Sequence, residues 1–104
     1  MAKRRTRLKA KKAPDGVKVT CLIKHPMETG NRLGEDGNKV PIHYIKVVRF
    51  AVNDEQVAAM YLGPGVSADP LLTLDIADVA SGDKVSVQWE DNKGETGTAE
   101  TVAK

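Results

Sequence analysis

Residues 84–102 read KVSVQWEDNKGETGTAETV, and this stretch decides the fold class. Its first seven residues alternate between polar and apolar, which is the period of a strand with one buried face. The apolar positions are Val85, Val87 and Trp89. Asp91-Asn92-Lys93-Gly94 then provides a tight turn, and the Thr-rich residues 95–102 favour a returning strand. The stretch therefore predicts an antiparallel hairpin.

Four further segments show strand periodicity upstream of this hairpin. They are residues 17–24, 42–52, 56–62 and 71–77, and Gly, Pro, Asn or Asp residues mark the turns that separate them. The expected buried face of the second segment is Ile42, Tyr44, Val48, Phe50 and Val52. No amphipathic run is long enough for a major helix. About six to seven short strands at this spacing are typical of an immunoglobulin-like antiparallel β-sandwich, so we expect an all-β fold.

The charge is distributed unevenly along a chain of 104 residues, a length that suits one domain. Residues 1–16 hold seven Lys and Arg against one acid, whereas the remainder holds nine Lys and Arg against thirteen acids. We therefore expect a basic, disordered tail over residues 1–15 and a domain over residues 16–104. An alternative interpretation of the tail is an anchor for an acidic surface or for nucleic acid.

The tail resembles an export signal in one respect, the pair Arg4-Arg5. Such a signal continues into an apolar stretch of roughly 7–15 residues. Lys9-Ala10-Lys11-Lys12-Ala13 follows instead, so we expect neither a signal peptide nor a membrane span.

The chemistry-bearing residues form no recognisable catalytic pattern. Cys21 lies on the apolar face of its predicted strand and is expected to be a small core residue. His25, in a loop and open to an accessible role, and His43 are too few for most metal sites. No serine lies in a nucleophile elbow, and Asp91 with Glu95 is ordinary turn chemistry. We therefore expect no enzyme activity, no cofactor and no metal.

Two irregular loops are the candidate partner-binding segments, residues 25–30 and 63–70, because binding groups concentrate on loops held by a rigid scaffold. The first opens a long aperiodic stretch that runs to Pro41. The candidate contact residues are His25, Pro26, Met27, Glu28, Gly63, Pro64 and Pro70. Met27 would offer an adaptable apolar contact, and the prolines would limit the entropy lost on docking. The alternative interpretation is that these loops only close the ends of the sandwich.

Several motifs carry a resemblance to a known family. They are His25-Pro26-Met27-Glu28-Thr29-Gly30, Val40-Pro41-Ile42-His43-Tyr44-Ile45, the run from Leu62 to Pro70, and Trp89-Glu90-Asp91-Asn92-Lys93-Gly94. In order and spacing, residues 16–102 resemble the SoxZ family, the small subunit of the SoxYZ carrier of bacterial thiosulfate oxidation. The basic residues 1–13 depart from the family pattern, being longer and more basic than it leads us to expect.

The resemblance implies a non-catalytic subunit that forms a heterodimer, or a higher assembly, with SoxY. In that family SoxY bears the sulfur-carrying cysteine on a Gly-rich C-terminal arm, and other Sox enzymes visit it transiently. The resemblance also implies a periplasmic location, reached by co-export with the signal-bearing partner, and it implies neither nucleic acid nor membrane binding. The rival hypotheses are a basic-tailed nucleic-acid-binding protein, a generic β-sandwich interaction module, and an enzyme that transfers sulfur on Cys21.

Overall fold

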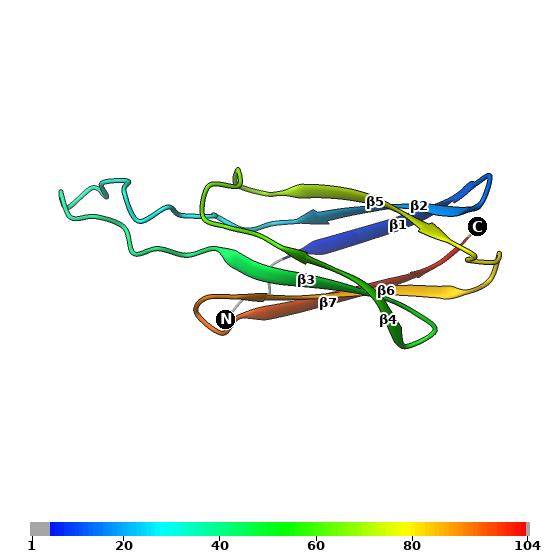
Figure 1. The fold of residues 1–104 in the computed structure, drawn as a ribbon. Helices are drawn as coiled ribbons and strands as arrows, with labels where there is room; N and C mark the ends of the chain where they lie inside the picture. Colours follow the sequence, from blue (N-terminus) through cyan, green and yellow to red (C-terminus); the bar gives the residue numbers. More distant parts are fainter. Residues whose placement is uncertain (1–4, 104) are drawn as a thin grey trace.

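The computed structural model describes residues 5–103 and shows two β-sheets packed face to face (Figure 1). The strands are β1 (Thr6–Ala13), β2 (Gly16–Ile23), β3 (Ile45–Val52), β4 (Glu55–Tyr61), β5 (Leu71–Ala77), β6 (Lys84–Asp91) and β7 (Thr96–Val102). One sheet has the order β1-β2-β5 and the other β4-β3-β6-β7, and every pairing is antiparallel. The predicted all-β sandwich is confirmed.

The described residues contain no helix, and therefore none long and apolar enough to cross a membrane.

The expectation of a disordered tail is wrong for residues 6–13, which form β1 along the edge of the smaller sheet. Within this strand Leu8 and Ala10 pack on the core, and the cations between them face solvent. A hairpin through Pro14-Asp15 joins β1 to β2. The high density of Lys and Arg favours disorder, whereas the alternation of Leu8 and Ala10 with the cations forms a strand. The tail residues 1–4 lie outside the described part of the chain.

The core is aliphatic around two aromatic side chains, Phe50 and Trp89, both fully buried. Trp89 also ties the two sheets together, since its Nε1–H donates to Thr6 Oγ1 of β1 at 2.8 Å. Cys21 is fully buried on the inner face of β2, as its position in the alternation predicted. Gly97 lies opposite Trp89 in the β6–β7 pairing, and a Cβ there would lie 2.3 Å from Trp89 Nε1. The indole therefore requires a glycine at this position.

A register shift between Ile45 and Val47 changes the predicted face of β3. The shift lets Ile45, Val47 and Val48 all be buried, which strict alternation forbids. Ile42, expected on the buried face, is 42% exposed and precedes the strand. The prediction for Ile42 was wrong because a bulge resets the period.

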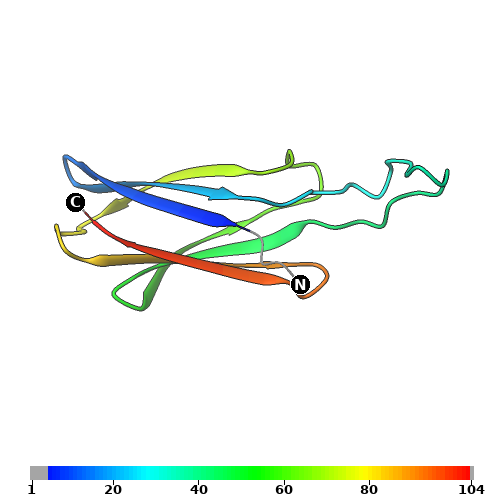
Figure 2. The same cartoon turned by 180° about the vertical axis from the view of Figure 1, so that it is seen from behind.

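The two long sides of the sandwich differ. On one side β1 and β7 lie next to each other and close the gap between the sheets (Figure 2). On the other side β4 and β5 are the outer strands of their sheets, and each is hydrogen-bonded to one neighbour only. The sandwich is therefore closed along β1 and β7 and open along β4 and β5.

Candidate partner interface

The predicted partner-binding residues do not form one exposed patch. His25, Met27 and Pro70 are buried, Pro26 is exposed, and Glu28, Gly63 and Pro64 are partly buried. The structure does bring the two loops together at one point, where the Asp69 N–H donates to His25 O at 2.9 Å. In return, the His25 N–H donates to Asp69 Oδ1 at 3.0 Å. The loops therefore support each other, and their buried members act within the domain.

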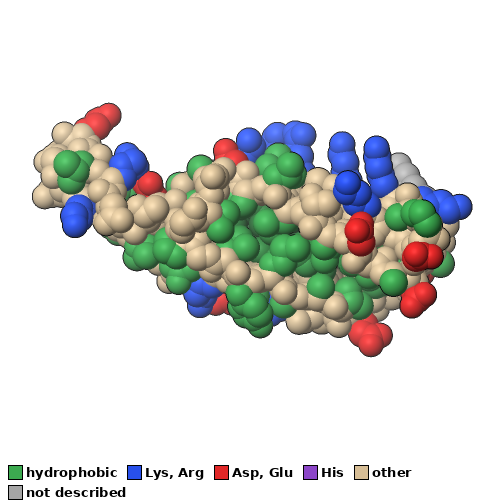
Figure 3. Space-filling model, turned by 45° about the horizontal axis from the view of Figure 1, so that its top comes forward, with side chains coloured by type: hydrophobic (Ala, Val, Ile, Leu, Met, Phe, Trp, Pro, Cys, Tyr) green, Lys and Arg blue, Asp and Glu red, His purple; other side chains and the backbone are tan. Residues whose placement is uncertain are grey.

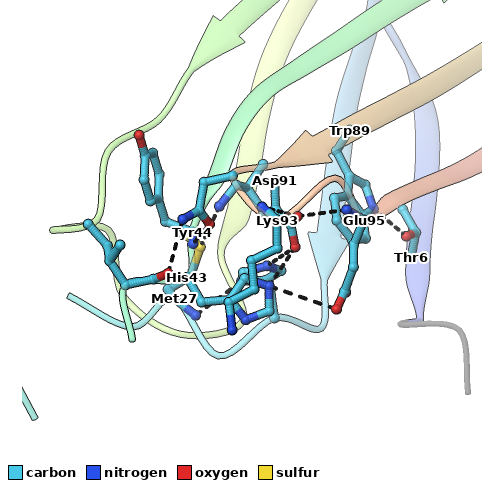
Figure 4. Close-up of polar contacts among 12 residues, drawn as sticks. Thr6, Met27, His43, Tyr44, Trp89, Asp91, Lys93 and Glu95 are labelled. Atoms are coloured by element: carbon cyan, nitrogen blue, oxygen red, sulfur yellow. Dashed lines mark hydrogen bonds and ion pairs between the residues drawn. The ribbon is translucent and has the colours of Figure 1, made fainter. Parts of the chain in front are cut away.

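His25, His43 and Asp91 form a buried cluster at the end of the sandwich where the long loop begins. Figure 4 labels His43 and Asp91 of this cluster. Nε2 of His25 lies 3.0 Å from Asp91 Oδ2, and Nε2 of His43 lies 2.6 Å from the same oxygen. The other oxygen, Oδ1, accepts the backbone N–H groups of Lys93 and Glu95 at 3.0 and 2.8 Å. One carboxylate therefore accepts four hydrogen bonds.

The hydrogen bonds assign the tautomer of His25. The Met27 N–H donates to His25 Nδ1 at 3.0 Å, so Nδ1 carries a lone pair. The proton of the neutral ring is then on Nε2, which donates to Asp91. The expectation that His25 is accessible from its loop is wrong, because its side chain is fully buried and engaged on both nitrogens.

Asp91 is ionised in this setting. Burial by itself raises the pKa of the carboxyl, but the hydrogen bonds from His25 and His43 and from two backbone N–H groups outweigh burial. The net result is a pKa below the ordinary value of 3.8. Asp91, which was expected only to form a turn, is therefore also the buried anion that accepts hydrogen bonds from both histidines.

The same three residues have the composition of a metal site, and their ligand atoms lie within 4.8 Å of one another. Two observations argue against that use. His25 Nε2 carries the proton that its hydrogen bond to Asp91 requires, so it has no lone pair to give a metal. Asp91 already accepts four hydrogen bonds. We interpret the cluster as a structural polar network.

Residues 28–43 leave the sandwich as a projecting two-limbed arm (Figure 1). Its base is closed by two backbone hydrogen bonds between Glu28 and His43, at 2.6 and 3.0 Å, and a second bridge joins Leu33 to Lys39. The Arg32 guanidinium pairs with the Glu28 carboxylate, with Nε 2.9 Å from Oε1, and lowers the pKa of that carboxyl. The predicted long aperiodic loop is thus an ordered extension that exposes Leu33 and Ile42.

Met27 fastens the base of the arm instead of offering a surface contact. Its side chain is buried in the core cluster, and its sulfur accepts the Ile45 N–H at 3.4 Å. Its backbone has a φ of 48°, a left-handed conformation that a side-chain-bearing residue holds only when its surroundings enforce it. The expectation of an adaptable partner contact at Met27 was therefore wrong.

The open side of the sandwich is apolar. It consists of inward-facing side chains of β4, β5 and the segment between them, which pack on the core but stay partly exposed: Ala58, Met60, Leu62, Val66, Leu72, Leu74 and Ile76. Two exposed hydrophobic residues of β4 lie at its edge, Val57 and Tyr61, the latter 80% exposed. Figure 3 shows hydrophobic side chains gathered across the middle of this view. The predicted loop over residues 63–70 reaches this surface at Val66, whereas none of its strand residues was among the predicted contacts.

Cys21 is not presented for chemistry. Burial raises the pKa of its thiol to about 11, so the thiolate needed for nucleophilic attack is scarce at neutral pH.

The fold and these surfaces define a class: an all-β sandwich with an ordered polar network at one end, a projecting arm and one open apolar side. The sequence model of the family described as "Sulphur oxidation protein SoxZ" matches residues 5–102. The chain belongs to the SoxZ family, which places it in the SoxYZ system of sulfur oxidation. No curated protein matches the chain. The family match includes β1, so the resemblance begins well before residue 16.

Proposed function

We propose that this chain is the non-catalytic subunit of the SoxYZ carrier, which binds SoxY and presents a docking surface to the Sox enzymes. SoxY carries the sulfur cargo on its cysteine in this proposal. The working location is the periplasm, reached by co-export with SoxY, in keeping with the family resemblance.

The open side between β4 and β5 carries the proposal. Two strand edges with one hydrogen-bonded neighbour each flank a partly exposed apolar strip. A partner that adds a strand to either edge would pair the free backbone groups and cover the strip. Burial of apolar area is the main favourable contribution to association, so this side is the surface that gains most from a partner.

The residues with reactive groups support a holding role. The thiol of Cys21 is buried with its pKa raised, and therefore fits core packing better than cargo transfer. The Nε2 atoms of both histidines are directed at Asp91. In this proposal SoxY supplies the thiol that carries the sulfur, because Cys21 of this chain is buried.

The experiment is co-expression with SoxY, followed by analytical ultracentrifugation of the complex. The double variant Val57→Asp/Tyr61→Asp places charge on the β4 edge, where it blocks strand addition without entering the core. We expect it to weaken SoxY binding by about tenfold or more. The matched control is Leu33→Asp/Ile42→Asp, which makes the same change in net charge at two exposed apolar residues of the arm.

The experiment distinguishes failure of the proposed function from failure of the proposed interface. If the unaltered chain does not associate with SoxY, the proposed function is wrong. If it associates and the β4 variant binds as tightly as the control, SoxY binds elsewhere and the open side is not the interface.

A further inference from the structure

The outward face of the β1-β2-β5 sheet is strongly basic. Side chains alternate along each strand, so every second residue points away from the core. The exposed cations on or next to this face, here called the basic face, are Arg5, Arg7, Lys9, Lys11, Lys18 and Lys24. Lys and Arg side chains stand in a row along the upper rim in Figure 3.

Strand register arranges this face in three rows across the sheet. The rows are Arg7-Leu22-Leu71, Lys9-Thr20-Thr73 and Lys11-Lys18-Asp75. Leu71 is 63% exposed beside Leu22, and therefore forms an apolar pair within the basic surroundings. Apolar residues ringed by charge are the usual pattern of a protein-binding surface.

Most cations of the basic face have no acidic partner among the described residues. Within residues 5–103, the four cations on β1 and β2 that form the rows make no ion pair; they are Arg7, Lys9, Lys11 and Lys18. Asp75 is the one acid in the three rows, and it does not come within ion-pair distance of Lys18 opposite. In the described part of the chain, Lys24 is the one member of the basic face that pairs with an acid, Asp69 at 3.8 Å, and both side chains are about half exposed.

This arrangement does not serve the stability of the sheet. Lys11 lies directly opposite Lys18, and like charges in such positions repel and destabilise a strand pair. Charges on an edge strand do prevent aggregation, but that explanation covers β1 and not Lys18 on the central strand β2. Binding to another molecule explains the charge of Lys18 better than stabilisation of the sheet does.

We propose that the basic face docks an acidic protein surface, on an enzyme that acts on the SoxY-bound sulfur. The choice of partner rests on the proposed function, whereas the site lies on a different face from the open side. Opposite charge on the partner would relieve the repulsion among the lysines and raise the association rate. The three-stranded face spans only about 20 Å by 10 Å, a size that suits a transient encounter.

Protein is favoured over nucleic acid as the occupant. The three rows contain no aromatic side chain on which a base could stack. They do contain the exposed Leu71 and the partly buried Leu22, which a phosphate backbone would leave uncovered. Residues 17–104 carry thirteen acids against nine Lys and Arg, two of which, Lys18 and Lys24, belong to the basic face, so the rest of the domain repels a polyanion.

The test measures association of the intact SoxY complex with each purified enzyme that acts on the SoxY-bound sulfur, by surface plasmon resonance from 20 to 300 mM salt. The variant is Lys9→Glu/Lys18→Glu, and the control is Lys39→Glu/Lys93→Glu, with the same change in net charge at exposed positions off the face. We expect the variant to lower the association rate for at least one enzyme about tenfold at 20 mM salt, with the difference shrinking at 300 mM. SoxY content of each complex is measured in parallel.

Two parallel arms use a 20-base-pair DNA duplex and vesicles of anionic phosphatidylglycerol. Equal association rates for variant and control with every enzyme would overturn the proposal. So would charge-dependent binding to the duplex or vesicles that exceeds binding to every enzyme. Loss of SoxY from the variant complex would show that the face belongs to the SoxY interface, which also overturns this inference while leaving the proposed function intact.

Discussion

Replacement of Asp91 by Asn is the sharpest test of the buried polar network. The substitution keeps the shape of the side chain but exchanges one acceptor oxygen for an NH₂ group. All four groups that now face the carboxylate are donors: the rings of His25 and His43 and the backbone N–H groups of Lys93 and Glu95. Whichever way the amide is turned, its NH₂ meets two donors.

The expected loss follows from that count. Two hydrogen bonds to a charged acceptor are lost, at about 1.5–3 kcal/mol each, and release from carboxylate burial offsets part of the loss. We expect the free energy of unfolding to fall by about 3 kcal/mol, a large fraction of the 5–15 kcal/mol typical of a domain. Asp91 also makes the free energy of unfolding depend on pH in the acid range. Because its folded pKa is lowered, its contribution is complete above 3.8 and is lost as pH falls below that value.

The assay is urea unfolding monitored by the fluorescence of Trp89, the one tryptophan, which is fully buried beside His25. The control is Asp75→Asn, an exposed acid for which we expect a change within about 0.5 kcal/mol. Between pH 4 and 2 the unaltered chain should lose more stability than Asp91→Asn. A loss below about 1 kcal/mol at pH 7, or parallel acid profiles, would refute the network as described.

Three further outcomes are expected. Gly97→Ala should lower the free energy of unfolding by about 2–3 kcal/mol, because its Cβ would overlap the Trp89 ring, while Gly65→Ala, with open space, should be near neutral in the same urea assay. Cys21 should react with a thiol reagent at pH 8 only after unfolding, since burial raises its pKa to about 11, and rapid labelling of the native chain would contradict this. Deletion of residues 1–13 removes β1 and should abolish cooperative unfolding by urea, whereas a dispensable tail predicts an unchanged transition.

The hairpin at residues 84–102 was predictable because its signals agree. Strict alternation, a turn rich in Asn and Gly and a Thr-rich return all favour the same structure, and the observed strands are Lys84–Asp91 and Thr96–Val102. Cys21 and Trp89 followed from the same alternation, and both are fully buried. Period-two patterns are thus reliable where one face of a strand packs on the core.

Strand β1 was missed because two signals conflict in residues 6–13. Its apolar members are small or few, and the cations between them dominate the composition. The strand becomes stable through pairing with β2 and through the hydrogen bond from Trp89 to Thr6, contacts that span up to 83 residues. Local charge density cannot report such long-range contacts.

The polar network was also beyond sequence reasoning. His25 precedes His43 by 18 residues, and Asp91 lies 48 residues further on, with no metal-type spacing to link them. The available signal was that His25 and Asp91 lie in the two motifs most specific to the family resemblance. The resemblance did not connect the two motifs to each other, because which atoms meet is decided by the turn geometry of both loops.

The contacts of His25 and His43 with Asp91 explain why the arm is ordered although it projects from the sandwich. The turn after β6 holds both limbs of the arm: Asp91 binds His25 and His43, and Asn92 bonds the backbone of Ile42 and Tyr44. Met27, held at a positive φ, fills the core beneath them. Because these contacts share one turn, a change in the network should alter the position of the arm as well as stability. A surface built on the arm would therefore take its geometry from side chains that are buried or partly buried at its base.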